Sequence, residues 1–156
     1  MTYKRVVLDT NVVISALLFK GRISMVHTFW MERAFTIVAS REIMEEYVRV
    51  LAYPKFNLTE SEIKDLLQEE LMPYIEPVAH GHTVVLSEGP QARAKKLNSG
   101  AQFKNVCVDP DDDKFLACAQ SAKADAIVSG DAHLLSLRKV KGCPIVTVGR
   151  FLREMT

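Results

Sequence analysis

The chain has 156 residues, of which 48% are hydrophobic and 25% are charged, and its formal net charge at pH 7 is +1. This composition is typical of a globular protein, and the length predicts a single domain over residues 1–156. A protein so evenly charged is not a generally basic nucleic-acid-coating protein, so any contact with nucleic acid must come from local clusters of charge. The sequence contains no run of about 18 apolar residues, which argues against a membrane span.

The cysteines and the N-terminus indicate a reducing compartment. The three cysteines have no CxxC spacing, which argues against a disulfide framework and against a zinc site. The first residues lead directly into an apolar strand pattern and lack the small-residue cleavage site of a signal peptide. We therefore expect a cytoplasmic protein whose cysteines are small buried apolar residues.

Short apolar runs rich in β-branched residues predict the strands. Four of these runs are continuous, as in strands that are buried on both faces of a parallel sheet. They are residues 6–8, 36–39, 126–128 and 144–148. A weaker run at residues 74–78 contains Pro77, which places this strand at an edge of the sheet or ends it early. The sequence thus predicts a parallel sheet of four or five strands.

Helical patterns separate these runs. Apolar stripes predict helices at residues 12–18 and 23–34. Ser40 is a good N-cap for the helix that follows it, and Thr59 with Glu62 forms a capping box for the next helix. A further helix is expected to begin at Asp109 and Pro110 and to continue to about residue 122. Strands that alternate with helices in this way predict an α/β fold with helices on both faces of the sheet.

Acidic residues follow the predicted strands. Asp9 directly follows the first strand, and Asp131 lies three residues after the third. Other acids crowd the starts of two helices. These are Glu42, Glu45 and Glu46 in one helix, and Asp109, Asp111, Asp112 and Asp113 in the other. Because ligands of open α/β sheets bind beyond the carboxyl ends of the strands, we expect several of these acids at one site.

Several of these acids also have a purely structural interpretation. Asp109 is better explained as a helix N-cap, Asp131 could cap the helix after it, and Glu45 is expected on a solvated surface. Asp9 is harder to explain in this way, because burying a lone charge at the end of a central strand is costly. Carboxylates that meet at one sheet edge repel one another, and a hard divalent cation such as Mg²⁺ or Mn²⁺ relieves that repulsion. Composition and spacing alone therefore predict a metal-dependent phosphoesterase or phosphotransferase.

Four segments of the chain resemble, in order, the motifs of PIN-domain ribonucleases. These segments are residues 6–13, 40–51, 109–117 and 124–135, and the C-terminal residues 144–147 and 151–152 also fit the pattern. Ordered matches over nearly the whole chain are more specific than a single Asp-Thr-Asn sequence would be. Within the family, the chain most resembles the toxin components of bacterial or archaeal toxin–antitoxin pairs.

The resemblance implies a three-layer α/β/α sandwich and a Mg²⁺- or Mn²⁺-dependent endoribonuclease that hydrolyses RNA phosphodiester bonds. The catalytic acids that it implies are Asp9, Glu46, Asp112 and Asp131. The implied metal ligands are Asp9, Asp112 and Asp131, with Glu46 and Asp113 as further candidates. The implied supporting residues are Thr10 and Ser129, which would orient the acids or the attacking water, and Asn11, which would brace the loop after the first strand. The implied partners are the RNA substrate, a cognate antitoxin and a second copy of the chain in a homodimer.

Three features leave parts of this assignment open. The family commonly has Asn where this chain has Asp113, so Asp112 and Asp113 compete for one role, and Glu45 competes with Glu46. The stretch at residues 79–105 is longer than usual in the subgroup, and its basic residues could contact the RNA backbone or form a solvated helix surface. These basic residues are Arg93, Lys95, Lys96 and Lys104. Together with a second basic group of Arg138, Lys139 and Lys141, they are the candidates expected around the acids to bind the RNA substrate.

Two other functions compete with the ribonuclease. An aspartate-nucleophile phosphatase would need a second acid two residues after the nucleophile, and Asn11 stands at that position after Asp9. A non-catalytic RNA-binding scaffold would be expected to have lost acids, whereas this chain retains all four. Cleavage that is abolished in Asp9→Asn while RNA binding survives would separate the enzyme from the scaffold.

Overall fold

The computed structural model describes residues 3–79 and 113–156. These residues form a six-stranded sheet with the strand order β3-β2-β1-β4-β6-β5. The strands are β1 (Arg5–Leu8), β2 (Thr36–Ala39), β3 (Ile75–Pro77), β4 (Ala126–Val128), β5 (Lys139–Val140) and β6 (Cys143–Val146). All pairings are parallel except that of β5 with β6, which is antiparallel. The four continuous runs therefore form parallel strands as predicted, and β3 is an edge strand that ends at Pro77.

The sheet differs from the prediction at its β5 edge. The predicted four or five strands become six because β5 has only two residues and no apolar run that could reveal it. The turn between β5 and β6 contains Lys141 and Gly142, both at positive φ, as a type I′ hairpin turn requires. The last predicted strand also ends earlier, at Val146. Thr147 accepts a hydrogen bond from the backbone N–H of Arg150 and caps a helix that the β-branched run had concealed.

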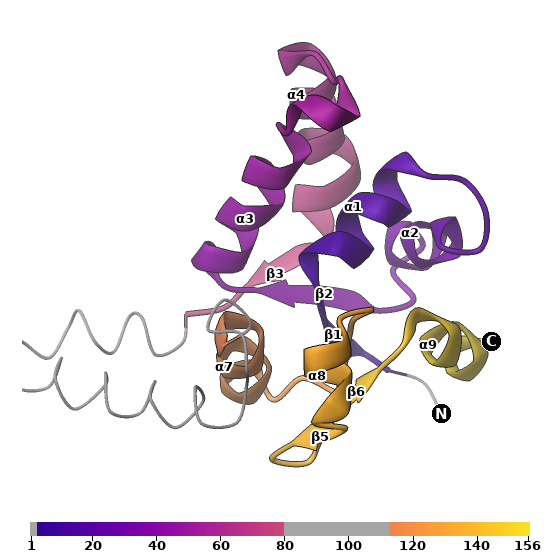
Figure 1. The fold of residues 1–156 in the computed structure, drawn as a ribbon, viewed down its shortest axis with the longest axis vertical. Helices are drawn as coiled ribbons and strands as arrows, with labels where there is room; N and C mark the ends of the chain where they lie inside the picture. Colours follow the sequence, from indigo (N-terminus) through magenta and orange to yellow (C-terminus); the bar gives the residue numbers. More distant parts are fainter. Residues whose placement is uncertain (1–2, 80–112) are drawn as a thin grey trace, which may run out of the picture.

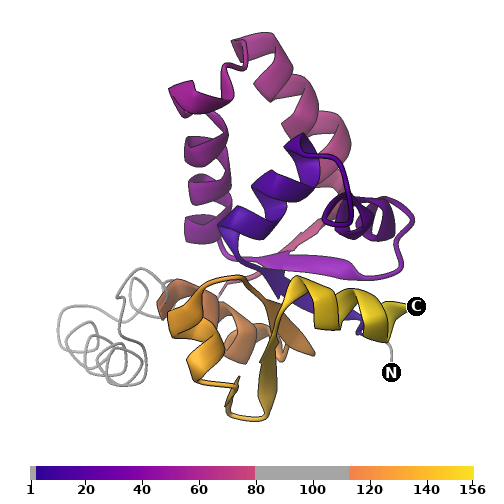
Figure 2. The same cartoon turned by 45° about the vertical axis from the view of Figure 1, so that its right-hand side comes forward.

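Helices cover both faces of the sheet, as predicted. They are α1 (Thr10–Leu18), α2 (Ser24–Met31), α3 (Arg41–Leu51), η1 (Pro54–Phe56), α4 (Glu60–Asp65), the π-helical η2 (Leu66–Leu71), η3 (Met72–Tyr74), α7 (Asp113–Ala122), α8 (Ala132–Ser136) and α9 (Val148–Met155). Elements α1 to α4 lie on one side of the sheet, and α7 and α8 lie on the other (Figures 1 and 2). The three layers follow from the strand order, because the chain moves from β1 outward to β3 and then returns past β1 to β4.

The local helix signals are confirmed where the structure describes them. Ser40 accepts a hydrogen bond from the backbone N–H of Ile43, and Thr59 and Glu62 form the reciprocal capping box. Residues 80–112 lie outside the described part, so the predicted helix start at Asp109 and the long stretch at residues 79–105 are not placed beyond Ala79.

The core is built on the two central strands. Every residue from Val6 to Leu8 in β1 and from Ala126 to Val128 in β4 is fully buried. Tyr47 of α3 is also buried, and its hydroxyl donates a hydrogen bond of 2.6 Å to the carbonyl oxygen of Leu8. This bond ties α3 to the last residue of β1, directly before Asp9. In the described part of the chain, no helix has the length and apolar character needed to cross a membrane.

Candidate active site

Asp9 lies where the central strand β1 passes into α1. Its backbone N–H continues the ladder to the carbonyl oxygen of Val128 in β4, and the residue is only 7% exposed. The hydroxyl of Ser129, which directly follows β4, donates a hydrogen bond of 2.6 Å to Asp9 Oδ2. The two central strands thus deliver an acid and the hydroxyl that holds it to the same edge of the sheet.

Two more acids lie close enough to Asp9 to affect its pKa. Burial raises the pKa of Asp9, and the negative charges of Asp131 and Glu46 raise it further. Hydrogen bonds from the Ser129 hydroxyl and from the backbone N–H of Thr10 oppose that rise in pKa. Three of the four predicted catalytic acids therefore lie close enough for their charges to interact.

Asp131 is both the cap of α8 and a neighbour of Asp9. Its Oδ1 accepts hydrogen bonds from the backbone N–H groups of His133 at 2.7 Å and Leu134 at 3.4 Å. Its own backbone N–H donates to Ser129 Oγ at 2.9 Å, so this hydroxyl links Asp131 to Asp9. The capping role that the sequence suggested is confirmed, and both capping bonds use the same oxygen of the carboxylate.

Glu46 projects from α3 toward the start of α1. Its Oε2 accepts a hydrogen bond from the hydroxyl of Thr10, and its side chain is 16% exposed. Glu45 instead has 61% of its side chain exposed and lies 3.8 Å from Arg41. Of the two competing glutamates, the structure therefore brings Glu46 to the edge of the sheet and leaves Glu45 on the solvated face of α3.

The sequence interpretation missed Lys114. Its Nζ lies 2.6 Å from Glu46 Oε1, and its side chain is only 13% exposed. The available signal was a single cation directly after the run of acids that ends at Asp113. Because α3 and α7 belong to different layers, only the fold reveals that Lys114 and Glu46 meet.

The remaining predicted site residues divide into two groups. Asp113 is partly buried at the start of α7, and Asn11 is exposed on the first turn of α1, which begins immediately after Asp9. No loop therefore separates β1 from α1 for Asn11 to brace. The residues that lie outside the described part of the chain are Asp112, Arg93, Lys95, Lys96 and Lys104. The choice between Asp112 and Asp113 as a ligand stays a prediction.

The second basic group does not surround the acids. Arg138, Lys139 and Lys141 are exposed on or beside the hairpin that leads into β6. Because β6 runs parallel to β4, this hairpin turn lies at the amino ends of the strands, whereas Asp9 and Asp131 follow carboxyl ends. Lys141 accordingly shares a surface depression with Lys123, close to the start of β4.

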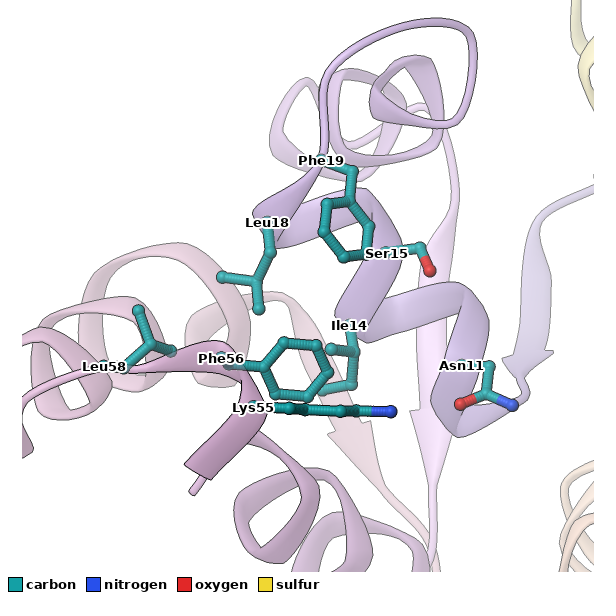
Figure 3. A pocket seen from close by; sticks show the side chains of 8 residues that line it. All are labelled: Asn11, Ile14, Ser15, Leu18, Phe19, Lys55, Phe56 and Leu58. Carbon is teal, nitrogen blue, oxygen red and sulfur yellow. The ribbon is translucent and has the colours of Figure 1, made fainter. Parts of the chain in front are cut away.

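An apolar groove begins beside the acidic edge. It has a volume of about 480 Å³ and lies between α1 and the segment around η1 (Figure 3). Its lining residues are Asn11, Ile14, Ser15, Leu18, Phe19, Lys55, Phe56 and Leu58. The ring of Phe19 is 52% exposed and lies 6.4 Å from the ring of Phe56, measured between centroids. Of these lining residues, Asn11 is the nearest in sequence to the acids, two residues after Asp9.

The donor set at this edge fits a hard divalent cation. Asp9, Glu46 and Asp131 offer carboxylate oxygens, and a cation would relieve the repulsion that raises the pKa of Asp9. Within residues 3–79 and 113–156, however, no three Asp, Glu, His or Cys side chains are gathered closely enough to hold a metal ion. Asp9 and Asp131 are the two acids at this edge whose described hydrogen-bond donors are uncharged. Water can supply the remaining ligands of such an ion, and Asp112, a further predicted ligand, lies outside the described residues.

Comparisons with known proteins agree with this architecture. The family described as PIN domain matches residues 5–133. FitAcB from Neisseria gonorrhoeae superposes with a TM-score of 0.54 and 16% identity, over 92% of this chain and 98% of that chain. PAE2754 from Pyrobaculum aerophilum superposes with a TM-score of 0.54 and 13% identity, over 97% of this chain and 88% of that chain. At these identities the two structures support the fold alone, and no curated protein matches the chain.

Proposed function

Because the chain belongs to the PIN-domain family, we propose that it is a Mg²⁺- or Mn²⁺-dependent endoribonuclease that acts in the cytoplasm. The observation that carries this proposal is the position of Asp9. A buried carboxylate ends the central strand, with two further acids close enough to raise its pKa. Such an arrangement is costly for the fold alone and suits a cation and a phosphate.

The residues of this chain have distinct roles in the proposed reaction. Asp9 and Asp131, together with Asp112 or Asp113, would hold the divalent ion, and the Ser129 hydroxyl fixes the relative positions of Asp9 and Asp131. When bound, such an ion lowers the pKa of a water molecule and stabilises negative charge on phosphate oxygens. Glu46, held by Thr10, orients the attacking water through a hydrogen bond. No histidine is needed as a general base.

Cleavage of a structured RNA pool tests the proposal. Wild-type protein is expected to cut RNA with Mn²⁺ or Mg²⁺ and to stop when EDTA is added. Asp9→Asn should lower the cleavage rate at least about 100-fold, since it removes the central charge of the site. Cleavage that persists in Asp9→Asn would contradict the assignment and indicate a contaminating nuclease.

Two further measurements separate the competing explanations. Binding of labelled RNA to Asp9→Asn should persist, and RNA binding without cleavage by the wild type would favour a non-catalytic scaffold. Glu46→Gln and Glu45→Gln form a matched pair on α3. Only the first should lower cleavage, because Glu46 contacts Thr10 whereas Glu45 faces solvent.

We further propose that the protein is the toxin of a toxin–antitoxin pair, in keeping with the subgroup that its motifs resemble. The groove of Figure 3 supports this proposal, because an apolar antitoxin segment in it would lie beside Asn11, two residues from Asp9. Co-expression with the product of the neighbouring gene should suppress cleavage, and Phe56→Asp should weaken that suppression. A homodimer is also proposed, and light scattering of the purified protein measures it directly.

A further inference from the structure

The carboxylate of Glu46 is held from both sides. Lys114 Nζ lies 2.6 Å from Oε1, and the hydroxyl of Thr10 donates to Oε2. Arg49 lies 3.7 Å from Oε1, but 62% of its side chain is exposed, so water screens its charge. Both oxygens of Glu46 thus already have donors, and the only well-buried cation among these donors is Lys114.

The burial of this ion pair makes it difficult to replace. The side chains of Lys114 and Glu46 are 13% and 16% exposed. If Glu46 turned toward a metal ion, the ammonium of Lys114 would lose its partner while remaining largely out of water, which is strongly unfavourable. A divalent ion bound directly to Glu46 would also stand close to the positive charge of Lys114, and the two would repel each other.

The other two acids at this edge are held differently. Ser129 Oγ and the backbone N–H groups at the start of α8 donate to Asp9 and Asp131, and these donors carry no charge. Neutral donors leave the negative charge of a carboxylate available to a cation, whereas the ammonium of Lys114 already pairs with Glu46. The edge therefore divides into a part at Asp9 and Asp131 without a paired cation and a part at Glu46 that is ion-paired.

We propose that Lys114 is a positioning residue that keeps Glu46 out of the coordination sphere of the divalent ion. Glu46 then acts on water or RNA through hydrogen bonds, and Asp9 and Asp131 supply the metal ligands from the described part of the chain. The inference rests on the proposed metal-dependent function and extends it by assigning a separate role to one acid.

Binding of Mn²⁺ to the full chain, measured by isothermal titration calorimetry, tests this role without relying on cleavage. Lys114→Met should bind Mn²⁺ at least about tenfold more tightly, because it removes a nearby positive charge and releases Glu46. Glu46→Gln should bind Mn²⁺ at least about tenfold more weakly, because Lys114 is then unneutralised. The double variant removes both charges and should bind within about threefold of the wild type.

A different pattern would overturn the inference. If Glu46 is a direct ligand and Lys114 a bystander, Lys114→Met leaves Mn²⁺ affinity unchanged and the double variant binds as weakly as Glu46→Gln. The comparison of Glu46→Gln with the double variant decides the question even if Lys114→Met fails to fold, because the double variant buries no unpaired charge at this position.

Two control variants define the effect. Lys114→Arg retains the positive charge and should keep wild-type Mn²⁺ affinity. Lys123→Met removes one charge just beyond the end of α7, beside Lys141, and should also leave Mn²⁺ affinity and cleavage unchanged. A wild type that binds Mn²⁺ but shows the bystander pattern contradicts only the role of Lys114. A wild type that binds no Mn²⁺ contradicts both this role and the proposed metal dependence.

Discussion

The sheet has acids at the amino ends of its strands (the amino edge) and at their carboxyl ends (the carboxyl edge), and the two sets are held in opposite ways. At the amino ends of β1 and β4, Asp125 is exposed, and its Oδ2 accepts hydrogen bonds of 2.9 Å from the backbone N–H groups of Lys4 and Arg5. Arg5 in turn forms an ion pair with Glu76 of β3. These contacts join three strands, and each charge or donor in them has a partner at the surface.

At the carboxyl ends of the same two strands, Asp9 is buried and its pKa is raised. The acids Asp131 and Glu46 repel its negative charge and contribute to that rise in pKa. At the amino edge, an acid thus accepts hydrogen bonds from backbone donors. At the carboxyl edge, acids repel one another, and a bound cation would relieve that repulsion. Under the proposed function, the first edge stabilises the fold and the second binds the ligand.

The strongest challenge to this division is the substitution Asp131→Asn. Asparagine is as good an N-cap as aspartate, so α8 should stay intact and the free energy of unfolding should change by less than about 0.5 kcal/mol. The loss of the carboxylate charge should nevertheless lower cleavage at least about 100-fold. Full cleavage in this variant, measured beside its urea unfolding curve, would reduce Asp131 to a helix cap.

Ser129→Ala should have a smaller effect of the same kind. The substitution removes the hydroxyl that joins Asp9 to the backbone of Asp131, and losing such an outer contact typically weakens metal affinity about 10- to 100-fold. Thr147→Ala, which removes the cap of α9, is the matched control and should affect stability alone. Equal Mn²⁺ affinity in Ser129→Ala and the wild type would show that Asp9 does not need this hydroxyl.

Asp125→Ala should produce the opposite result at the amino edge. It leaves the backbone N–H groups of Lys4 and Arg5 without their acceptor, which should lower the free energy of unfolding by about 1–2 kcal/mol. Cleavage at a temperature where the variant remains folded should be unchanged. A loss of cleavage from the folded variant would mean that the two edges are not independent.

The smallest expected effect of the difference between the two edges is on how the free energy of unfolding depends on pH. Because folding raises the pKa of Asp9, the native state binds a proton at Asp9 more tightly than the unfolded state does. The contribution of Asp9 to stability therefore falls as pH rises from acid toward neutral. In EDTA, Asp9→Asn should therefore gain stability relative to the wild type as pH rises from the unfolded-state pKa through the raised native one. Parallel curves for the two proteins would show that burial does not perturb Asp9.

The parts of the molecule that local sequence determines were predictable. Continuous β-branched runs identified the buried strands, and Ser40, Thr59 and Glu62 marked helix starts through contacts within a single turn. The same reasoning failed at Val148, where the β-branched pattern continues from β6 into α9 and only the cap at Thr147 reveals the change.

The candidate site was predictable only in part, because its contacts join distant segments. The burial of Asp9 at the end of a central strand was predictable without a structure. The choice of Glu46 over Glu45 follows from the rotation of α3 against the sheet, which no local pattern fixes. Lys114 was not predictable because its partner lies on a helix of another layer. The expected position of the basic group at Arg138 was wrong because the hairpin beside it lies at the amino ends of the strands.

The most direct test of the account is a crystal structure of the protein with Mn²⁺, in which anomalous scattering locates the ion. The account predicts a peak within coordinating distance of Asp9 and Asp131, while Glu46 stays on Lys114 and Thr10. A Mn²⁺ ion bound elsewhere, with Asp9 contacted by Ser129 alone, would contradict the claim that the carboxyl edge of this sheet is a metal-dependent nuclease site.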